Sequence, residues 1–202
     1  MEKQHWEAVY ADRPPEAVSW YQREPALSLA MMEAAGVAPQ DPVIDVGGGA
    51  SLLVDRLLER GFSRVTVLDL AESALAAARA RLGPLQQRVD WVVADATAWQ
   101  PPPAAYALWH DRAVFHFLVE SAERDGYLRA LRRGLAPGGH AVFATFAPSG
   151  PQRCSGLPVR RYSAESLAAT LGAEFQLLES RPETHITPAG TPQDFQWCLF
   201  RR

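Results

Sequence analysis

Residues 109–117 read WHDRAVFHF and place His110, Asp111, Arg112 and His116 among aromatic side chains. Such a segment is a metal site, a catalytic pair, a substrate-binding surface, or a hydrogen-bonded part of the core. Zinc needs clustered ligands, typically histidines at helical i,i+4 spacing or cysteine partners. The two histidines are six residues apart and have no cysteine beside them. We therefore predict no metal ion, and the catalytic pair, the substrate-binding surface and the core segment stay open.

A second set of residues has types and spacing suited to a nucleotide-like cofactor. In VIDVGGGASLL, glycines 47–49 lie between an expected strand and an expected helix. The backbone turns sharply there and can approach a ligand closely, because glycine has no Cβ. A plain tight turn is the alternative. Asp45 before the glycines, and Asp69 and Asp95 at the ends of the next two expected strands, favour a binding site.

The acids also indicate which cofactor fits. Asp69 follows Gly49 by 20 residues, the spacing at which an acid meets a ribose hydroxyl, and this alone would also suit NAD. Leu52, however, stands where the dinucleotide fingerprint has its third glycine. Asp45 would repel a pyrophosphate but would suit an ammonium group. S-adenosylmethionine (SAM) has an ammonium group and no phosphate, so we predict SAM.

The rest of the chain alternates short β-rich runs with Ala- and Leu-rich helical runs, which is typical of a parallel sheet covered on both faces. The expected strands are 42–46, 64–70, 88–95, 106–111, 140–146, 174–180 and 194–200. The expected helices are 51–61, 71–83, 122–135 and 163–172. The APGG sequence at 136–139 is expected to be a turn that ends the third of these helices. The last two strands have no helix between them and are expected to pair antiparallel.

We predict a single α/β domain, with a Rossmann-like, doubly wound sheet, over residues 1–202. Residues 1–38 are expected to form an N-terminal helical segment, and residues 39–202 the core. Aromatic residues gather in the first segment, which is either a lid or simply packing on the sheet. They are Trp6, Tyr10, Trp20 and Tyr21.

Composition restricts the class of protein. The chain is 48% hydrophobic and 21% charged, with a formal net charge of -3, so we expect no nucleic-acid partner and no membrane span. The first residues have no secretory or transit character. Cys154 and Cys198 form no CxxC pair and are expected to be thiols. We predict a cytoplasmic protein, monomeric or dimeric.

DVGGG, LDL and ADAT resemble the glycine motif, ribose acid and adenine-edge motif of class I SAM-dependent methyltransferases. The resemblance covers nearly the whole chain. It implies a seven-stranded sheet of order 3-2-1-4-5-7-6 with the last strand antiparallel. It also implies a methyl acceptor as partner. The predicted cofactor contacts are Trp20, Tyr21, Asp45, Gly47, Gly48, Gly49, Asp69, Leu70, Asp95, Ala96 and His110.

Residues 109–117 are also similar to the segment after strand four in lysine methyltransferases related to those of citrate synthase and elongation factor 1A. Those eukaryotic enzymes have Asp followed by Lys-Gly-Thr there; Asp111 matches the acid, and RAV replaces the rest. We therefore predict a protein-lysine N-methyltransferase. The alternative is a methyltransferase of a small thiol, amine or metalloid. A SAM-binding sensor is a third, non-enzymatic possibility.

Loops at the carboxyl ends of strands supply the remaining candidates, because such loops carry function in these sheets. They include the expected loops 147–163 and 181–193. The predicted catalytic residues, which would orient an amine, are Asp111, His110 and Tyr162, and the predicted substrate contacts are Arg112, His116, Cys154, Arg160 and His185. Three alternatives stay open: His116 as core, Asp111 and Arg112 as a structural ion pair, and the loop residues as ordinary surface.

Overall fold

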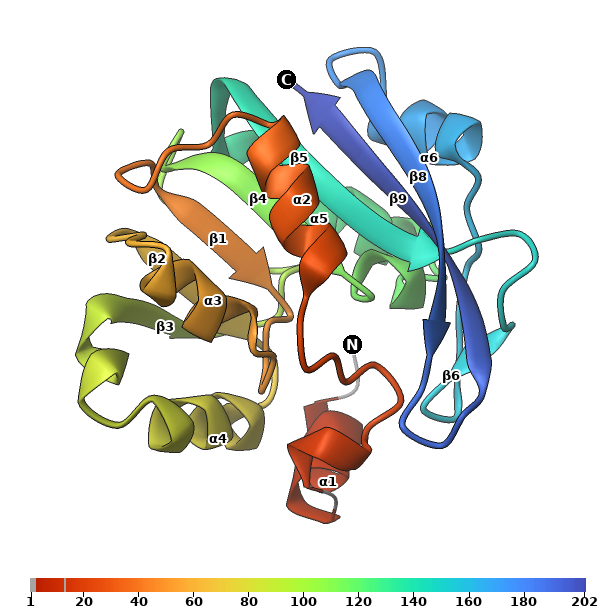
Figure 1. Ribbon diagram of the computed structural model, residues 1–202. Helices are drawn as coiled ribbons and strands as arrows, with labels where there is room; N and C mark the ends of the chain where they lie inside the picture. Colours follow the sequence, from red (N-terminus) through yellow and green to blue (C-terminus); the bar gives the residue numbers. More distant parts are fainter. Residues whose placement is uncertain (1–2, 13) are drawn as a thin grey trace.

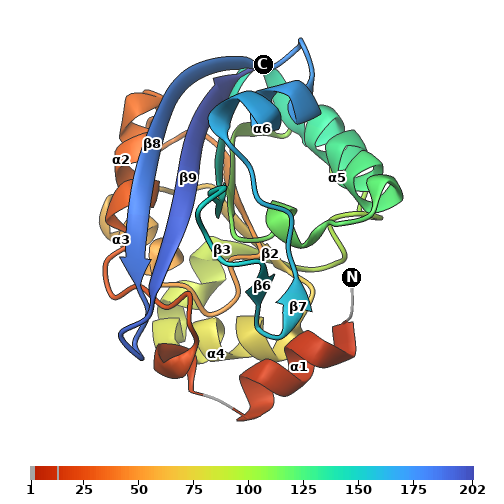
Figure 2. The ribbon, with the colours of Figure 1, turned by 90° about the vertical axis from the view of Figure 1, so that its right-hand side faces the viewer.

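The computed structural model describes residues 3–12 and 14–202, with helices on both faces of a central sheet (Figures 1 and 2). The main-sheet strands are β1 Val43–Val46, β2 Val65–Asp69, β3 Val89–Val93, β4 Tyr106–Arg112, β5 Leu135–Phe146, β8 Gln176–Ile186 and β9 Pro192–Arg201. The α-helices are α1 Lys3–Asp12, α2 Ala26–Ala34, α3 Leu53–Glu59, α4 Glu72–Leu82, α5 Ser121–Gly134 and α6 Ala164–Leu171. None of the helices in these two ranges is both long and apolar enough to cross a bilayer.

Shorter elements complete the chain. The 3-10 helices are η1 Pro15–Ala17, η2 Gly83–Arg88 and η3 Phe115–Phe117, and a small hairpin consists of β6 Arg153–Cys154 and β7 Leu157–Pro158. This hairpin lies inside the long loop that was expected after the fifth strand. It therefore gives that loop a fixed shape close to the carboxyl end of the sheet.

The main sheet has the order β3-β2-β1-β4-β5-β9-β8. The first five strands pair parallel, and β9 runs antiparallel to both β5 and β8. Because β8 and β9 are the sixth and seventh strands of this sheet along the chain, the predicted order and the antiparallel last strand are confirmed. The strand order reverses between β1 and β4, the position at which open α/β sheets bind ligands.

The core has two layers, one on each face of the sheet. Successive strand residues point to opposite faces, so Val43 packs with residues of α2 and α3, whereas Ile44 packs with residues of α5 and α6. Figure 2 shows these helix pairs on the two sides of the strands. Every residue of β1 and β2 is buried. The strand ends that carry the site are therefore held rigidly from both sides.

The expected turn at APGG was wrong. Helix α5 ends at Gly134, and β5 begins at once at Leu135, so residues 136–139 are part of the strand. The pairing with β4 shifts in register in this region, and Gly138 has a φ of +77°. That value is easy for glycine and strained for other residues. The glycine-rich sequence thus bends the strand, whereas we had expected it to precede the strand.

The expected loop at 181–193 was also too long. Strands β8 and β9 continue to Ile186 and from Pro192, so only residues 187–191 connect them. β8 is an edge strand that pairs only with β9, and its burial alternates along most of its length. A strand at a sheet edge tolerates proline and polar residues, because one side of its backbone needs no partner. This is why RPETHI forms a strand although its composition is typical of a loop.

The N-terminal segment predicted at 1–38 divides into two parts; its residues 1, 2 and 13 lie outside the described residues. Helix α2 packs on the sheet and contributes Met31, which is fully buried, to the core. Helix α1 and η1 instead lie across the carboxyl ends of the strands, against α4 (Figure 1). This first part covers the site with Trp6 and Tyr10, and α2 adds Ser28 to its wall.

Candidate functional site

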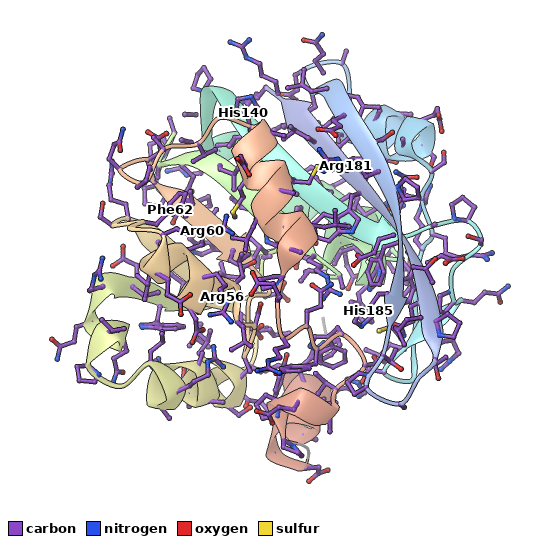
Figure 3. The ribbon with its side chains drawn as sticks, viewed as in Figure 1. Arg56, Arg60, Phe62, His140, Arg181 and His185 are labelled. Carbon is purple, nitrogen blue, oxygen red and sulfur yellow. The ribbon has the colours of Figure 1, made fainter. Side chains whose placement is uncertain are left out.

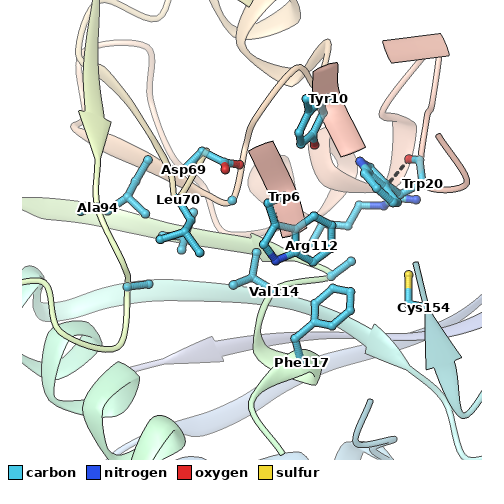
Figure 4. A pocket seen from close by; sticks show the side chains of 15 residues that line it. Trp6, Tyr10, Trp20, Asp69, Leu70, Ala94, Arg112, Val114, Phe117 and Cys154 are labelled. Carbon is cyan, nitrogen blue, oxygen red and sulfur yellow. Dashed lines mark hydrogen bonds between the residues drawn. The ribbon is translucent and has the colours of Figure 1, made fainter. Parts of the chain in front are cut away.

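Two adjoining pockets lie at the carboxyl ends of β1, β2 and β4. The first holds about 610 Å³ of space (Figure 4) and the second about 540 Å³. Both are lined by Tyr10, Trp20, Gly47 and Arg112. Because they share these walls, they form one site, and part of its space is open to solvent. We name its two ends the carboxylate side, with Asp45, Asp69 and the glycine turn, and the arginine side, with Arg112 and Cys154.

The glycine turn forms the floor of the carboxylate side. The N–H groups of Gly47 and Gly48 both donate to the carbonyl oxygen of Leu68, at 2.7 and 3.2 Å, which fixes the turn to β2. Gly47 has a φ of +69°, and a Cβ there would lie 2.0 Å from Cγ2 of Val114. A Cβ on Gly48 would lie 2.6 Å from Oδ2 of Asp45. The turn therefore has room for glycine only.

Asp45 is held in place by neighbouring side chains. Nδ1 of His110, on the adjacent strand β4, donates to Oδ1 of Asp45 at 2.7 Å. Nε2 of the same ring lies 3.0 Å from Oγ of Ser28 on α2. Both nitrogens of His110 are thus engaged, so its predicted role as a group that orients the substrate amine is not supported. His110 instead fixes the Asp45 carboxylate beside the glycine turn, where both residues line the second pocket.

Asp69 ends β2 and lines the first pocket. Its Oδ1 accepts a hydrogen bond from the N–H of Ala71 at 2.8 Å. Burial raises the pKa of Asp69 to about 7, and the charge of Asp45 adds to the rise, whereas the Ala71 N–H opposes it. A bound hydroxyl donor would stabilise the ionised form, since hydrogen bonds to a carboxylate favour its charge.

An apolar slot continues from Asp69. Leu70, Ala94, Ala96 and Val114 line it. Asp95, predicted to contact the cofactor, is not among the residues that line either pocket. Its Oδ1 accepts from the N–H and the hydroxyl of Thr97, at 2.8 and 2.7 Å, and thereby shapes the turn after β3. The sequence placed the right segment here, but Ala96 rather than Asp95 faces the pocket.

Arg112 dominates the arginine side and is half-buried. Its Nη1 donates to the carbonyl oxygen of Trp20 at 2.8 Å, the dashed line in Figure 4. Its guanidinium carbon lies 5.1 Å from the centre of the Phe195 ring. Burial lowers the pKa of Arg112 to about 10, so the side chain stays charged at neutral pH. Cys154, a predicted substrate contact, also lines this side, and burial raises the pKa of its thiol to about 11.

Aromatic rings roof the pocket. Trp6 lies 5.8 Å from Trp20 and 5.0 Å from Phe117 between ring centres, and Tyr10 lies 6.1 Å from Trp20. Tyr21 and Trp20, both predicted cofactor contacts, line the second pocket. Two carboxylate–amide hydrogen bonds hold the roof in place, because Glu7 of α1 accepts from the N–H groups at the start of α4, at 2.9 and 3.1 Å.

Asp111 and Tyr162 do not face either pocket, and their predicted catalytic roles are not supported. The Asp111 carboxylate is fully buried and accepts from the N–H groups of Val114 and Phe115 and from the hydroxyl of Tyr127, the last at 2.5 Å. Tyr162 is buried in the core layer that contains α5 and α6. Asp111 therefore fixes the loop after β4, and no ion pair joins it to Arg112 in the part of the chain that the structure describes.

Three predicted substrate contacts also lie elsewhere. His116 is fully buried, its Nδ1 accepts from the N–H of Phe146, and burial lowers its pKa to about 3, so the core alternative fits it. Arg160 is exposed, and its guanidinium lies over the Tyr162 ring. His185, labelled in Figure 3, donates from Nε2 to the carbonyl oxygen of Ser19 at 2.8 Å. It joins the β8–β9 hairpin to the roof segment.

Several lining residues were missed by the sequence analysis. Trp6 and Tyr10 had been noted only as aromatic residues of a possible lid, and Val114 and Phe117 had not been singled out at all. Trp6 and Tyr10 are four residues apart, so they share one face of α1. That spacing was a usable signal. The position of Val114 depends on the turn held by Asp111 and has no local signal.

Comparisons with known proteins agree with this geometry. A family model described as a methyltransferase domain matches residues 43–139, which include the glycine turn, Asp69 and Arg112. Residues 43–139 thus resemble a methyltransferase domain, and the sheet has the fold of class I SAM-dependent methyltransferases. These findings support the enzyme class and the SAM cofactor predicted from the sequence, and a solved methyltransferase of the same fold holds S-adenosylhomocysteine (SAH).

That solved structure is 1,6-didemethyltoxoflavin-N1-methyltransferase from Burkholderia thailandensis, with 21% identity, a TM-score of 0.72, and coverage of 99% of this chain and 83% of that one. Protein-L-isoaspartate O-methyltransferase from Methylorubrum populi is 30% identical over 143 residues, 70% of this chain. The mouse eEF1A lysine and N-terminal methyltransferase is 23% identical over 138 residues, 68% of it. The matches span 63% and 19% of those two relatives.

Proposed function

We propose that the protein transfers the methyl group of SAM to a small-molecule acceptor bound on the arginine side of the pocket. The observation that carries this proposal is the shape of the site. Two carboxylates and a glycine turn line the site, and a roofed chamber with aromatic walls and one cation, Arg112, adjoins them. The two ends share Gly47, so a ligand on the glycine turn borders the chamber directly.

The carboxylate side fits SAM. The missing Cβ atoms at Gly47 and Gly48 leave the backbone open to close approach, as a turn beneath a ligand requires. Asp45 supplies a fixed carboxylate for the ammonium group, and Asp69 accepts from the ribose hydroxyls. The slot that includes Leu70 and Ala96 has the apolar surface for the adenine. We assign these four contacts to the cofactor.

When bound, SAM supplies a sulfonium methyl group for in-line displacement by a nucleophile. The chain's own residues contribute alignment and a dry chamber, which are effective means of accelerating such a reaction. Trp6, Trp20 and Phe117 exclude water from above. Asp45 cannot swing away from the cofactor while His110 holds it.

The chamber favours an acceptor that is already nucleophilic at neutral pH. Cys154 is a neutral thiol, Arg112 is a cation, and both nitrogens of His110 are engaged, so none of them is a ready base. A lysine must lose a proton before it reacts, which costs roughly 4 to 5 kcal/mol at pH 7. Arg112 would also repel the protonated lysine. A small thiol, carboxylate or weakly basic amine meets neither obstacle.

Protein-lysine methylation stays a prediction from the sequence. Its support is the Asp111 match and the distant similarity to the eEF1A methyltransferase. The buried position of Asp111 removes the acid that would have received the lysine. The name of the Methylorubrum relative describes methylation of a protein carboxylate, and the match spans 63% of that relative.

The proposal is tested with purified protein, methyl-labelled SAM and a lysate of the source cells separated into protein, nucleic-acid and small-molecule fractions. We expect label in the small-molecule fraction. Label confined to a protein band would overturn the small-molecule acceptor, and mass spectrometry of that band would identify the methylated side chain. The glycine-turn variant Gly47→Ala is the matched negative control, since it should lose the cofactor.

A further inference from the structure

The guanidinium of Arg112 has one side bound and one side open. Nη1 is anchored on the Trp20 carbonyl, whereas Nε and Nη2 are buried and have no hydrogen-bond partner among the described residues. The N–H groups of Nε and Nη2 point in the same direction from the planar guanidinium. Together they form a two-pronged donor that matches the two oxygens of a carboxylate. Buried donors without partners are rare and costly in folded proteins.

The charge of Arg112 also has no counter-charge in contact. No ion pair of Arg112 is found within residues 3–12 and 14–202. Glu183, the first acid whose charge acts on Arg112, accepts instead from Trp197 at 2.7 Å and from Gln22 at 3.1 Å. Asp45 is held by His110. Cys154 is a neutral thiol at pH 7. A cation with two buried, unpartnered donors favours an anion from outside the chain, because buried charges are usually paired.

We propose that the methyl acceptor carries a carboxylate, and that the Nε and Nη2 donors of Arg112 bind it on the arginine side of the pocket. This inference rests on the proposed function and names the class of acceptor. The aromatic rings of Trp6, Trp20 and Phe117 then enclose the body of an acceptor that is apolar apart from its carboxylate and its nucleophile.

The SAM carboxylate is the other possible source of the same group. Arg112 lines the second pocket too, together with Asp45 and Gly48. The amino-acid end of SAM, which we assign to Asp45, would therefore lie in the same pocket as Arg112. The two sources make different predictions. An acceptor carboxylate leaves cofactor affinity independent of Arg112. A cofactor carboxylate makes SAH binding, but not the binding of 5′-methylthioadenosine, depend on Arg112, because 5′-methylthioadenosine lacks the amino-acid portion.

The first arm of the test is therefore calorimetric titration of wild type, Arg112→Gln and Arg112→Lys with SAH and with 5′-methylthioadenosine. We expect both ligands to bind each variant within threefold of wild type. A tenfold loss for SAH alone would assign the donors to the cofactor and overturn the proposal. Thermal unfolding of each variant checks that it is folded, and Arg112→Lys keeps the charge if Arg112→Gln does not fold.

The second arm uses SAH-saturated protein and monocarboxylates from acetate to phenylacetate, each paired with its neutral amide. We expect at least one carboxylate to bind tenfold more tightly than its amide, and this preference to vanish in Arg112→Gln. Arg161→Gln is the matched control, because exposed Arg161 also donates to a main-chain carbonyl, that of Pro148, but lines neither pocket. Arg161→Gln should still bind the carboxylate more tightly than its amide.

Equal binding of every carboxylate and its amide overturns the proposal, and so does a preference that survives in Arg112→Gln. The proposed function fails differently. It fails if the protein binds neither SAM nor SAH, or if no small molecule is labelled. If wild type binds SAH and labels a small molecule but shows no preference for a carboxylate over its amide, only the acceptor carboxylate is overturned.

Discussion

The two sides of the pocket differ in how their polar groups are satisfied. On the carboxylate side, Asp45 is bonded to His110 and Asp69 to the backbone of Ala71, so the chain itself completes the site. On the arginine side, two donors of Arg112 have no described partner. The difference indicates that the first side is built in advance for one cofactor, whereas the second becomes complete only with its ligand.

The largest expected effect is a loss of SAM affinity on the carboxylate side. Gly47→Ala introduces a Cβ that would lie 2.0 Å from Cγ2 of Val114, at a φ of +69°. A left-handed backbone conformation costs a non-glycine residue on the order of 1 kcal/mol. The collision also displaces Val114 from the apolar slot that we assign to the adenine. We expect SAM affinity to fall by about 100-fold, equivalent to roughly 3 kcal/mol, in a calorimetric titration.

Gly61→Ala is the control for backbone strain, because Gly61 also has a positive φ, +84°, but nothing lies within 4 Å of its would-be Cβ. It should bind SAM like wild type. Equal losses in the two variants would mean that strain, and not close packing over the turn, explains the effect.

Asp111 faces neither pocket, so substituting it tests whether the residue acts in folding or in catalysis. An amide at this position can accept from fewer of the three donors, Val114 N–H, Phe115 N–H and Tyr127 hydroxyl. We expect Asp111→Asn to lower the free energy of unfolding by about 2 kcal/mol and the melting temperature by roughly 6 °C. SAM affinity should change less than threefold. Unchanged melting with lost methyl transfer would restore the catalytic role predicted from the sequence.

The pH dependence of SAM affinity follows from Asp69. Its pKa is about 7 in the ligand-free site, and the ribose hydroxyls need the ionised carboxylate as acceptor. Binding therefore lowers this pKa, so affinity rises with pH up to about 7 and is flat above it. Between pH 8 and pH 6 we expect roughly a tenfold loss. Calorimetry near pH 6.5 in buffers of different ionisation enthalpy should detect proton release; none would contradict this account.

The smallest effect concerns the roof. Glu7 binds the start of α4 with its carboxylate, and a charge at a helix N-terminus is more favourable than a neutral amide. We expect Glu7→Gln to increase the dissociation rate of SAH by about threefold, measured by stopped-flow fluorescence of the roof tryptophans. Glu16→Gln makes the same exchange at an exposed residue of the same segment and should leave the rate unchanged.

The carboxylate side was predictable because its signals are local. The glycines, Asp45 and Asp69 occur at fixed distances around βα turns, and a parallel sheet brings the ends of neighbouring strands together. The sheet order was predictable for the same reason. His110 lines the second pocket, but its bonds to Asp45 and Ser28, 65 and 82 residues away in sequence, gave no local signal.

The arginine side was only partly predictable, because its contacts join distant segments. Arg112 is anchored on Trp20, 92 residues away in sequence, and Asp111 turns inward to a tyrosine hydroxyl on α5. Neighbouring polar residues at a strand end look equivalent in the sequence. In the fold, strand alternation sends Arg112 to the pocket and Asp111 to the core. The structure therefore gives no support to the catalytic role predicted for Asp111.

The most direct test of the account is a titration of wild type and Asp69→Asn with SAH, together with their ligand-free melting temperatures at pH 8. Burial raises the pKa of Asp69 from its usual 3.8 to about 7. Ionising this buried carboxyl is unfavourable in the folded protein. The free energy of unfolding therefore falls as pH rises from about 4 to above 7.

Asp69→Asn removes that charge. We expect it to bind SAH at least tenfold more weakly and yet to melt roughly 5 °C higher, on the order of 2 kcal/mol. Weaker binding with higher stability would show that the carboxylate is kept for the cofactor. Unchanged SAH affinity in Asp69→Asn would contradict the account.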